Sequence, residues 1–304
     1  MVNTDLVGPQ TKDPCQRLLS LAGEPNARWL RPYVESMISI LMLHLAFRDA
    51  VRFLERGEGW RLVMATVLGA CFLASLSSRL KLSAARLALL MLIFKLSRVF
   101  PSCANHFYLE VLSVALISIG YRPDTTGKGD GYQELRSLSQ SFRWTLIIMF
   151  FWSGVRKLGQ GTYVNGSFLA STIRQEGSPA RDFFQVILPN DEFTRLVNTE
   201  FPGPFLFDSP FPVVLSNAVY LVEIAIPVLL LTQRFRTIGF WLTFGSIVAI
   251  EVVARELMFG GLFVLLLLFF TEGKLASRLL PVFAAYYAIL FLITAGAIPG
   301  LSFN

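Results

Sequence analysis

The sequence has little charge, little cysteine and little histidine. Charged residues make up 16% of the 304 positions, and the chain contains three cysteines and two histidines. With 54% hydrophobic residues and a mean hydropathy of +0.55, it carries more apolar surface than one aqueous core can bury. The composition therefore predicts an integral membrane protein that crosses the bilayer several times.

Several functional classes lack the residues that they need. Cys15, Cys71 and Cys103 do not have the spacing of a disulfide framework or a zinc site. No H-E-x-x-H or C-x-x-C pattern occurs, so we predict no metal centre. Ser153 lies outside a G-x-S-x-G frame, and the glycine cluster at 126–132 indicates a turn and no phosphate loop. Neither a serine hydrolase nor a nucleotide-binding protein is expected.

Positive charge is distributed along the whole chain. Lys and Arg number 27 against 21 Asp and Glu, a formal charge of +6. These cations separate apolar segments and form no single basic face, so we expect membrane lipid as a partner and no nucleic acid. Basic residues occur in nearly every connection, which leaves the membrane orientation open. Residues 1–33 lack the long apolar stretch of a signal peptide.

Apolar segments follow one another along most of the chain. A membrane span needs about 20 mainly apolar residues. Eight stretches supply the cores of such spans: Leu62–Ser77, Leu87–Val99, Phe107–Tyr121, Trp144–Val155, Pro212–Thr232, Ile238–Val253, Gly260–Thr271 and Leu279–Ile298. Tyr33–Phe53 mixes apolar residues with charges, which fits either a tilted span or a helix in the membrane interface. We predict an all-α polytopic membrane protein: a polar N-terminal segment at 1–33, then a single helical membrane domain at 34–304, a bundle of eight or nine helices.

The connection at 159–210 is longer than an ordinary loop. It contains the runs "RDFFQVILP", "EFTRLV" and "FPGPFLF", in which apolar residues alternate with prolines and charges. We predict a lid or an interfacial helical hairpin that covers a membrane pocket, and packing against lipid headgroups is the alternative.

Polar residues cluster where one apolar segment begins, in "CANHFYLEVL". On a helix, Asn105 and Tyr108 share one face at a spacing of three, and His106 and Glu110 share another at a spacing of four. Both faces could border a polar cavity. The alternative is a helix cap by Asn105 beside an interfacial histidine and tyrosine.

A second polar group interrupts an apolar run at Arg156 and Lys157, shortly before Gly159 and Gly161. A lysine at a helix end can complement the helix dipole and extend to the lipid headgroups. The alternative is chemical, because an adjacent fixed cation and partial burial both favour a neutral amine, which can act as a base.

Two glutamates complete the candidates. Glu223 lies about one turn before Pro227 and fits either a pocket residue or a structural anchor. Glu251 and Arg255, four residues apart, fit an intramembrane ion pair. His44 has no evident partner and is predicted to be an interfacial histidine.

Three separated segments together resemble the horizontally transferred transmembrane domain family, whose best-known relative is the vitamin K-dependent γ-carboxylase. They are "NHFYL" at 105–109, "SGVRKLGQGTYVNGSF" at 153–168 and "VEIAIPVLLLTQRFR" at 222–236. The likeness extends over roughly residues 34–275. It departs from the family in a later helix. The family commonly shows a histidine there, whereas the nearest ionisable residue in this sequence is Glu251. We also expect no counterpart of the carboxylase's large lumenal portion.

The resemblance implies roles for individual residues. Lys157 matches the lysine that deprotonates reduced vitamin K, and His106, with Asn105, matches the histidine that assists oxygenation and epoxide formation. The supporting or pocket residues would be Tyr108, Arg156, Tyr163, Glu223 and Glu251.

These roles imply an enzyme that uses reduced vitamin K or a related quinol with O2 to deprotonate a peptide or a small molecule, and CO2 if carboxylation is retained. A quinone-linked oxidase or oxygenase remains open, as does a non-enzymatic quinone- or lipid-binding module or transporter. Product mass and bicarbonate dependence distinguish the two enzymes. Transport without chemistry would identify the transporter.

Overall fold

The computed structural model describes residues 27–100, 105–123, 132–175, 178–200, 203–254, 257–270, 276–295 and 297. Within these ranges every regular element is a helix. The long helices are α2 (Ala27–Arg56), α3 (Gly59–Ser75), α4 (Lys81–Val99), α5 (Asn105–Gly120), α6 (Tyr132–Gln160), α10 (Pro210–Leu231), α11 (Arg236–Ala254), α12 (Leu257–Leu267) and α13 (Ala276–Thr294). The short ones are α7 (Ser167–Ile173), α8 (Pro179–Ile187), α9 (Asn190–Asn198), η1 (Gln233–Phe235) and η2 (Leu268–Phe270). Within the described residues the all-α prediction is confirmed, and most of the described part of each predicted apolar segment is helical.

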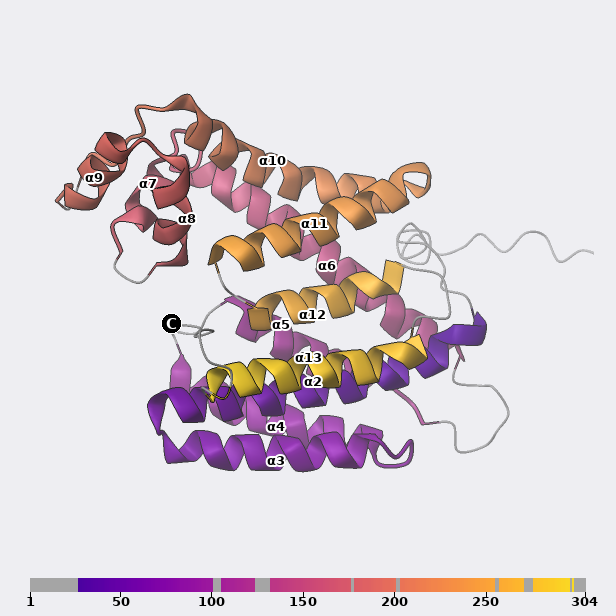
Figure 1. Ribbon diagram of the computed structural model, residues 1–304. Coiled ribbons are helices and arrows are strands. Elements are labelled where there is room, and N and C mark those ends of the chain that lie inside the picture. The colour runs from indigo at the N-terminus through magenta and orange to yellow at the C-terminus, as the bar shows by residue number, and fades with distance from the viewer. Residues whose placement is uncertain are drawn as a thin grey trace, which may run out of the picture.

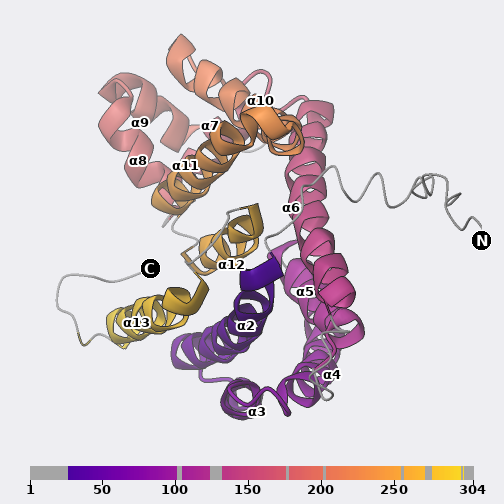
Figure 2. The same cartoon turned by 90° about the vertical axis from the view of Figure 1, so that its right-hand side faces the viewer.

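The helices form two packed groups joined by α6. Helices α2 to α5 pack in sequence order, and α13 returns along α2 (Figure 1). At the other end of the bundle, α10 packs against α11 and the C-terminal part of α6. The end-on view shows α6 running along one side of both groups, with α12 between them (Figure 2). The two ends of the long helix α6 therefore lie in different helix groups.

Helix α2 is the central helix of the first group. Its apolar residues recur every three or four positions, and Val34, Ile38, Leu41 and Leu45 are fully buried against neighbouring helices. This burial by protein disfavours the interfacial-helix alternative for Tyr33–Phe53. Helix α2 begins at Ala27, so its first turns include the last residues of the predicted polar segment at 1–33. Residues 1–26 lie outside the described ranges.

Helix α12 ends inside the bundle, where side chains of other helices donate to carbonyl groups at its end. The Tyr33 hydroxyl donates to the Leu265 carbonyl at 2.8 Å, and the Arg143 Nε donates to the Phe269 carbonyl at 2.7 Å. The last carbonyls of a helix have no intrahelical donor, so a buried helix end needs such contacts. They fix α12 between α2 and α6.

Among the described helices, only α10 has both the length and the apolar composition of a membrane span. Shorter apolar helical stretches occur at Gly59–Ser75, Phe107–Gly120, Gly260–Phe270 and Pro281–Ile293.

The connection at 159–210 folds into α7, α8 and α9 around a small core of their own. Ala170, Ile173, Phe184, Leu188 and Leu196 form this core. The Glu192 carboxylate joins it to α10: the backbone N–H groups of Asp208 and Ser209 donate to Oε1 at 2.7 and 3.0 Å, and the Ser209 hydroxyl donates to Oε2. Glu192 thus fixes α9 to the residues that start α10.

We predict that Glu192→Gln loosens α7 to α9. Burial raises the pKa of Glu192, but the hydrogen bonds from Ser209 and Asp208 outweigh it, so the pKa lies below its usual value. A carboxylate with a lowered folded pKa stabilises the fold above the unfolded value of about 4.3, and this stabilisation is lost as pH falls through the folded pKa. Amide exchange in α9 should accelerate at least about tenfold at pH 7, since a hydrogen bond to a charged group contributes about 1.5–3 kcal/mol.

The matched control for that prediction is Asp191→Asn, which removes a neighbouring exposed carboxylate. Equal exchange rates in the Glu192 and Asp191 variants at pH 7 would contradict the role of Glu192.

Candidate functional site

A cavity of about 450 Å3 lies among α5, α6, α10, α11 and α12, and Lys157 lies at its polar side. We call it the Lys157 cavity. Its lining consists of Tyr108, Met149, Phe150, Trp152, Ser153, Arg156, Lys157, Gln160, Tyr163, Glu223, Ile247, Ile250 and Phe263. Most of the wall is therefore apolar or aromatic, with a few polar groups on α6 and α10, as is typical of small-molecule sites.

The polar side of the cavity is built around an ion pair. The Lys157 Nζ donates to Glu223 Oε1 and lies 5.4 Å from the centroid of the Tyr163 ring. Glu223 is buried, and its second oxygen, Oε2, has no hydrogen-bond partner among the described residues. A buried carboxylate with a free acceptor can receive one further donor.

Local sequence places both members of the pair. Lys157 occupies the last turn of α6, where a cation complements the negative end of the helix dipole. The chain then turns at Gly161, whose φ of 71° suits glycine, and α10 holds the turn: the Ser216 hydroxyl donates to the Tyr163 carbonyl at 2.7 Å. Gly159 lies within the helix, so the chain leaves α6 at Gly161.

Gly154 sets the distance between α6 and α10. A Cβ at this position would lie 2.7 Å from Ile224 Cγ1 and 3.0 Å from the Tyr220 carbonyl oxygen. Small residues allow such close helix contacts in membrane proteins. Because Gly154 precedes Lys157 by three residues, this contact also sets how near Lys157 lies to Glu223.

We predict that Gly154→Ala pushes α10 away from α6 and weakens the ion pair, because the added methyl group meets backbone as well as a side chain. The thermal unfolding midpoint in detergent should fall by several degrees. Gly159→Ala is the matched control in the same helix, since a Cβ there meets nothing within 4 Å. A similar midpoint for the two variants would contradict the close-packing role of Gly154.

The structure brings five of the eight predicted site residues to this cavity: Tyr108, Arg156, Lys157, Tyr163 and Glu223. Arg156 is exposed at the rim, and Glu223, not Arg156, contacts the Lys157 amine. The pairing of Lys157 with a carboxylate was not anticipated from the sequence.

The other three predicted site residues are not among the described lining of the Lys157 cavity. Helix α5 begins at Asn105, but the side chains of Asn105 and His106 lie outside the described residues, so their roles stay predictions. Glu251 lies against Gly260 of α12, where a Cβ would overlap its carboxylate, and it is not part of the cavity wall. Its predicted partner Arg255 lies outside the described ranges.

A set of buried charges was missed by the sequence reasoning. The Arg48 guanidinium pairs with Glu110, and the Lys95 amine lies 2.5 Å from Asp49. The prediction of an interfacial His44 without a partner is wrong, since His44 is 1% exposed and bonded to a tyrosine. The sequence signal for this set was the row of charged residues in Tyr33–Phe53. These residues were interpreted as interfacial, but the structure buries several of them between helices.

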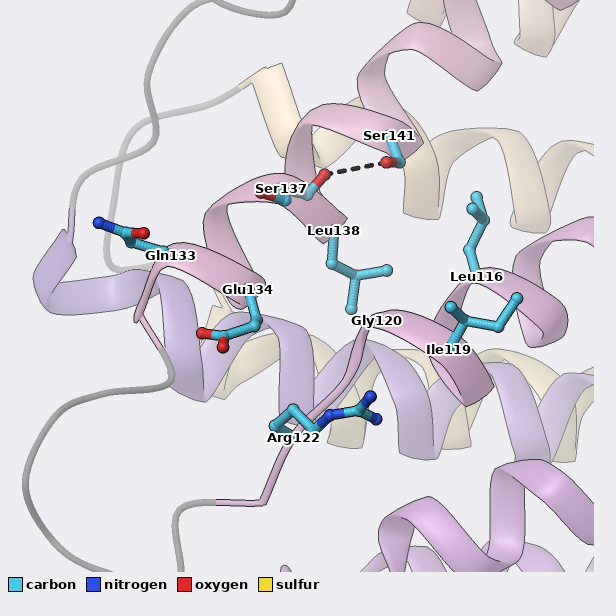
Figure 3. A pocket seen from close by; sticks show the side chains of 9 residues that line it. All are labelled: Leu116, Ile119, Gly120, Arg122, Gln133, Glu134, Ser137, Leu138 and Ser141. Carbon is cyan, nitrogen blue, oxygen red and sulfur yellow. Dashed lines mark hydrogen bonds between the residues drawn. The ribbon is translucent and has the colours of Figure 1, made fainter. Parts of the chain in front are cut away.

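A second, more open cavity of about 400 Å3 lies where the end of α5 meets the start of α6 (Figure 3). Its lining residues are Leu116, Ile119, Gly120, Arg122, Gln133, Glu134, Ser137, Leu138 and Ser141. The Ser141 hydroxyl donates to its own helix at the Ser137 carbonyl, at 2.9 Å (Figure 3). None of the predicted site residues lies here. Among the described residues, no group of three or more His, Cys, Asp or Glu is placed to hold a metal ion.

Comparison of the chain with protein-family models, with curated proteins and with solved structures gives no match.

Proposed function

We propose that this protein is a multi-pass membrane enzyme that uses a reduced quinone and O2 at the Lys157 cavity to deprotonate a second substrate, in the manner of the vitamin K-dependent γ-carboxylase. The observation that carries the proposal is the Lys157–Glu223 pair at the polar side of an otherwise apolar cavity. The same lysine was singled out by the sequence resemblance.

Outward-facing apolar side chains support several membrane crossings. Helices other than α10 fall short of a full span by length or composition but still expose large apolar residues. Among these are Leu73 on α3, Leu90 on α4, Trp241 on α11 and Val282 on α13, each at least 60% exposed. Soluble monomers rarely expose such apolar surface over many helices, whereas lipid chains cover it.

The lining of the Lys157 cavity fits a quinol. Phe150 and Phe263 meet edge to face at 5.5 Å, and with Ile247 and Ile250 they offer an apolar wall to a ring and its hydrocarbon tail. On the other side, the free Glu223 oxygen and the Lys157 amine offer an acceptor and a donor to a phenolic hydroxyl. When bound, a reduced quinone would supply electrons to O2 and, through that oxidation, a strong base.

Lys157 and Glu223 act as a pair in this proposal. Moving one proton along their hydrogen bond converts ammonium and carboxylate into neutral amine and carboxylic acid while the net charge of the pair stays zero. A neutral amine thus becomes available without leaving an unpaired charge in an apolar site. Lys157 then takes the proton of the quinol hydroxyl, and the resulting ammonium stabilises the negative charge that remains beside it.

The remaining cavity residues position the substrates and limit water. The Tyr163 ring covers the Lys157 amine, and the backbone of that tyrosine is held by Ser216. Tyr108 and Arg156 lie at more exposed parts of the wall, where a second substrate or its carboxylate can reach them. His106 and Asn105 are proposed to assist at the start of α5, as the family resemblance implies.

The test supplies reduced phylloquinone and a glutamate-containing peptide, as the second substrate, to the purified protein in lipid nanodiscs. It follows O2 uptake with 13C-bicarbonate present and identifies the products by mass spectrometry. Uptake with epoxide formation and a 13C-carboxylated product supports the carboxylase-like reaction. Uptake without 13C incorporation supports a quinone-linked oxidase. A folded protein that retains phylloquinone without any O2 uptake would overturn the enzyme proposal in favour of a binding module, and mass spectrometry of copurified ligands would identify what it binds.

A further inference from the structure

On the opposite face of α5 from the Lys157 cavity lies a buried group of ionisable side chains that the proposed reaction does not use. It consists of His44, Arg48 and Asp49 of α2, Lys95 of α4 and Glu110 of α5, each at most 7% exposed. We call it the α2 charge cluster. Burying so many ionisable groups in an apolar bundle is costly, and in membrane proteins such groups commonly serve proton or ion movement.

Ion pairs explain four of the five members. Arg48 pairs with Glu110 and Lys95 with Asp49, and both cations lie over the Phe107 ring at about 5.5 Å from its centroid. These contacts make the four charges neutral as a set. A purely structural cluster would be complete with them, and His44 would not be needed.

His44 has a partner at each ring nitrogen. Its Nδ1 lies 2.5 Å from the Tyr287 hydroxyl of α13, and its Nε2 lies 3.5 Å from Glu110 Oε1. A tyrosine hydroxyl can donate or accept. A neutral imidazole can therefore accept from Tyr287 and carry its N–H at Nε2, while a protonated imidazole can donate to the Tyr287 oxygen and pair with Glu110. Both protonation states of His44 have partners in the same geometry.

Glu110 also has capacity for a second cation. Its Oε2, like Arg48 Nη2 and Asp49 Oδ2, has no hydrogen-bond partner among the described residues. The carboxylate already faces Arg48 and lies next to His44, so a proton on His44 adds an attraction to Glu110 that partly offsets the cost of a buried charge.

The charges around His44 leave room for one proton. Arg48 on its own helix opposes protonation, and Glu110 of α5 favours it. The Tyr287 hydroxyl is neutral, and Glu251 of α11, which acts on Tyr287 electrostatically, also favours a positive charge there. Lys95 of α4 and Arg61 of α3 both face Asp49, at 2.5 and 3.8 Å. At the rim of the cluster, Glu58 pairs with Arg61 at 2.8 Å and lies 3.9 Å from the exposed Arg56. The three buried cations therefore meet three carboxylates before His44 is counted.

We propose that His44 is a reversible proton-binding site in the membrane bundle. A proton from the aqueous phase forms a new N–H bond at Nδ1, the Tyr287 hydroxyl turns from donor to acceptor, and Glu110 compensates the added charge. The site plays no part in the proposed quinol chemistry. His44 would bind its proton whichever substrate the Lys157 cavity takes.

The test is 15N NMR of the histidine rings in the full chain in lipid nanodiscs. The chain has two histidines, so His106→Gln leaves only the signals of His44. For His44 we expect one unprotonated and one protonated ring nitrogen at high pH and two protonated ring nitrogens at low pH. The change between these states should be reversible and fall between pH 5 and 9. Glu110→Gln should keep the ring neutral down to pH 5. If the His44 ring keeps one protonation state from pH 5 to pH 9 in the protein that retains Glu110, the proposal is overturned.

Tyr286→Phe is the matched control for Tyr287→Phe. It removes the adjacent hydroxyl, which is not the one bonded to His44, and should leave the titration of His44 unchanged, whereas Tyr287→Phe should move the Nδ1 signal. If His106→Gln does not fold, the two histidines of the wild-type chain are told apart by the signal that Tyr287→Phe moves. Equal spectra for the two tyrosine variants would show that Tyr287 is no partner of His44 and would also overturn the proposal.

Discussion

Lys157→Met should abolish quinol-dependent O2 uptake while leaving the protein folded. Methionine keeps the apolar length of the side chain but cannot accept a proton, and a positioned acid or base typically contributes 10²- to 10⁴-fold to a rate. We therefore expect turnover to fall by at least about a hundredfold. Small primary amines added to the variant should restore part of the activity, because the cavity of about 450 Å3 can admit them.

Lys157→Arg is the control that separates a base from a charge anchor. Arginine can keep the ion pair with Glu223, but it stays protonated at any working pH and cannot act as a base. The base role predicts that both variants lose activity and that amines rescue only the methionine variant. Activity in Lys157→Arg close to that of the wild type would show that Lys157 serves only to neutralise Glu223.

The helices could be predicted from the sequence because each apolar run carries its own local signal. Every predicted segment became a helix, including Tyr33–Phe53 within α2. The short helices α7 to α9 were foreseen only as an unspecified lid or hairpin. Among the described residues of the 159–210 connection, Gln160 and Tyr163 are the ones that line the Lys157 cavity. This connection therefore contributes to one edge of the wall, and a role as a lid stays a prediction.

The candidate site was harder to predict because its contacts join distant parts of the chain. Lys157 is 66 residues from Glu223, so the sequence could mark both as unusual without showing that they meet. The α2 charge cluster shows the same limit, since Arg48 and Glu110 are 62 residues apart. Local spacing suggested pairs within one helix, such as Glu251 with Arg255, whereas the ion pairs of both sites join different helices. Which helices are neighbours is decided by packing, and a single sequence does not display it.

Arg48→Met should strongly destabilise the helical bundle. It removes the partner of Glu110 in the centre of the molecule and leaves a buried carboxylate uncompensated, and breaking a buried pair in this way costs about 3–5 kcal/mol. Unfolding in mixed detergent micelles, followed by circular dichroism, measures the change. The matched control is Arg52→Met on the same helix, which breaks an exposed ion pair with Glu55. It should change the free energy of unfolding by less than about 1 kcal/mol.

The double variant Arg48→Met with Glu110→Leu decides whether the cost comes from the unpaired charge or from lost packing. Replacing both members of a buried pair by apolar residues of similar size is often neutral or stabilising, so the double variant should recover most of the loss of Arg48→Met. Arg48 also lies over the Phe107 ring, a contact that methionine can partly replace. If the double variant is as unstable as Arg48→Met alone, the stem of Arg48 stabilises α2 by packing, and the charge of Glu110 is compensated by other groups of the cluster.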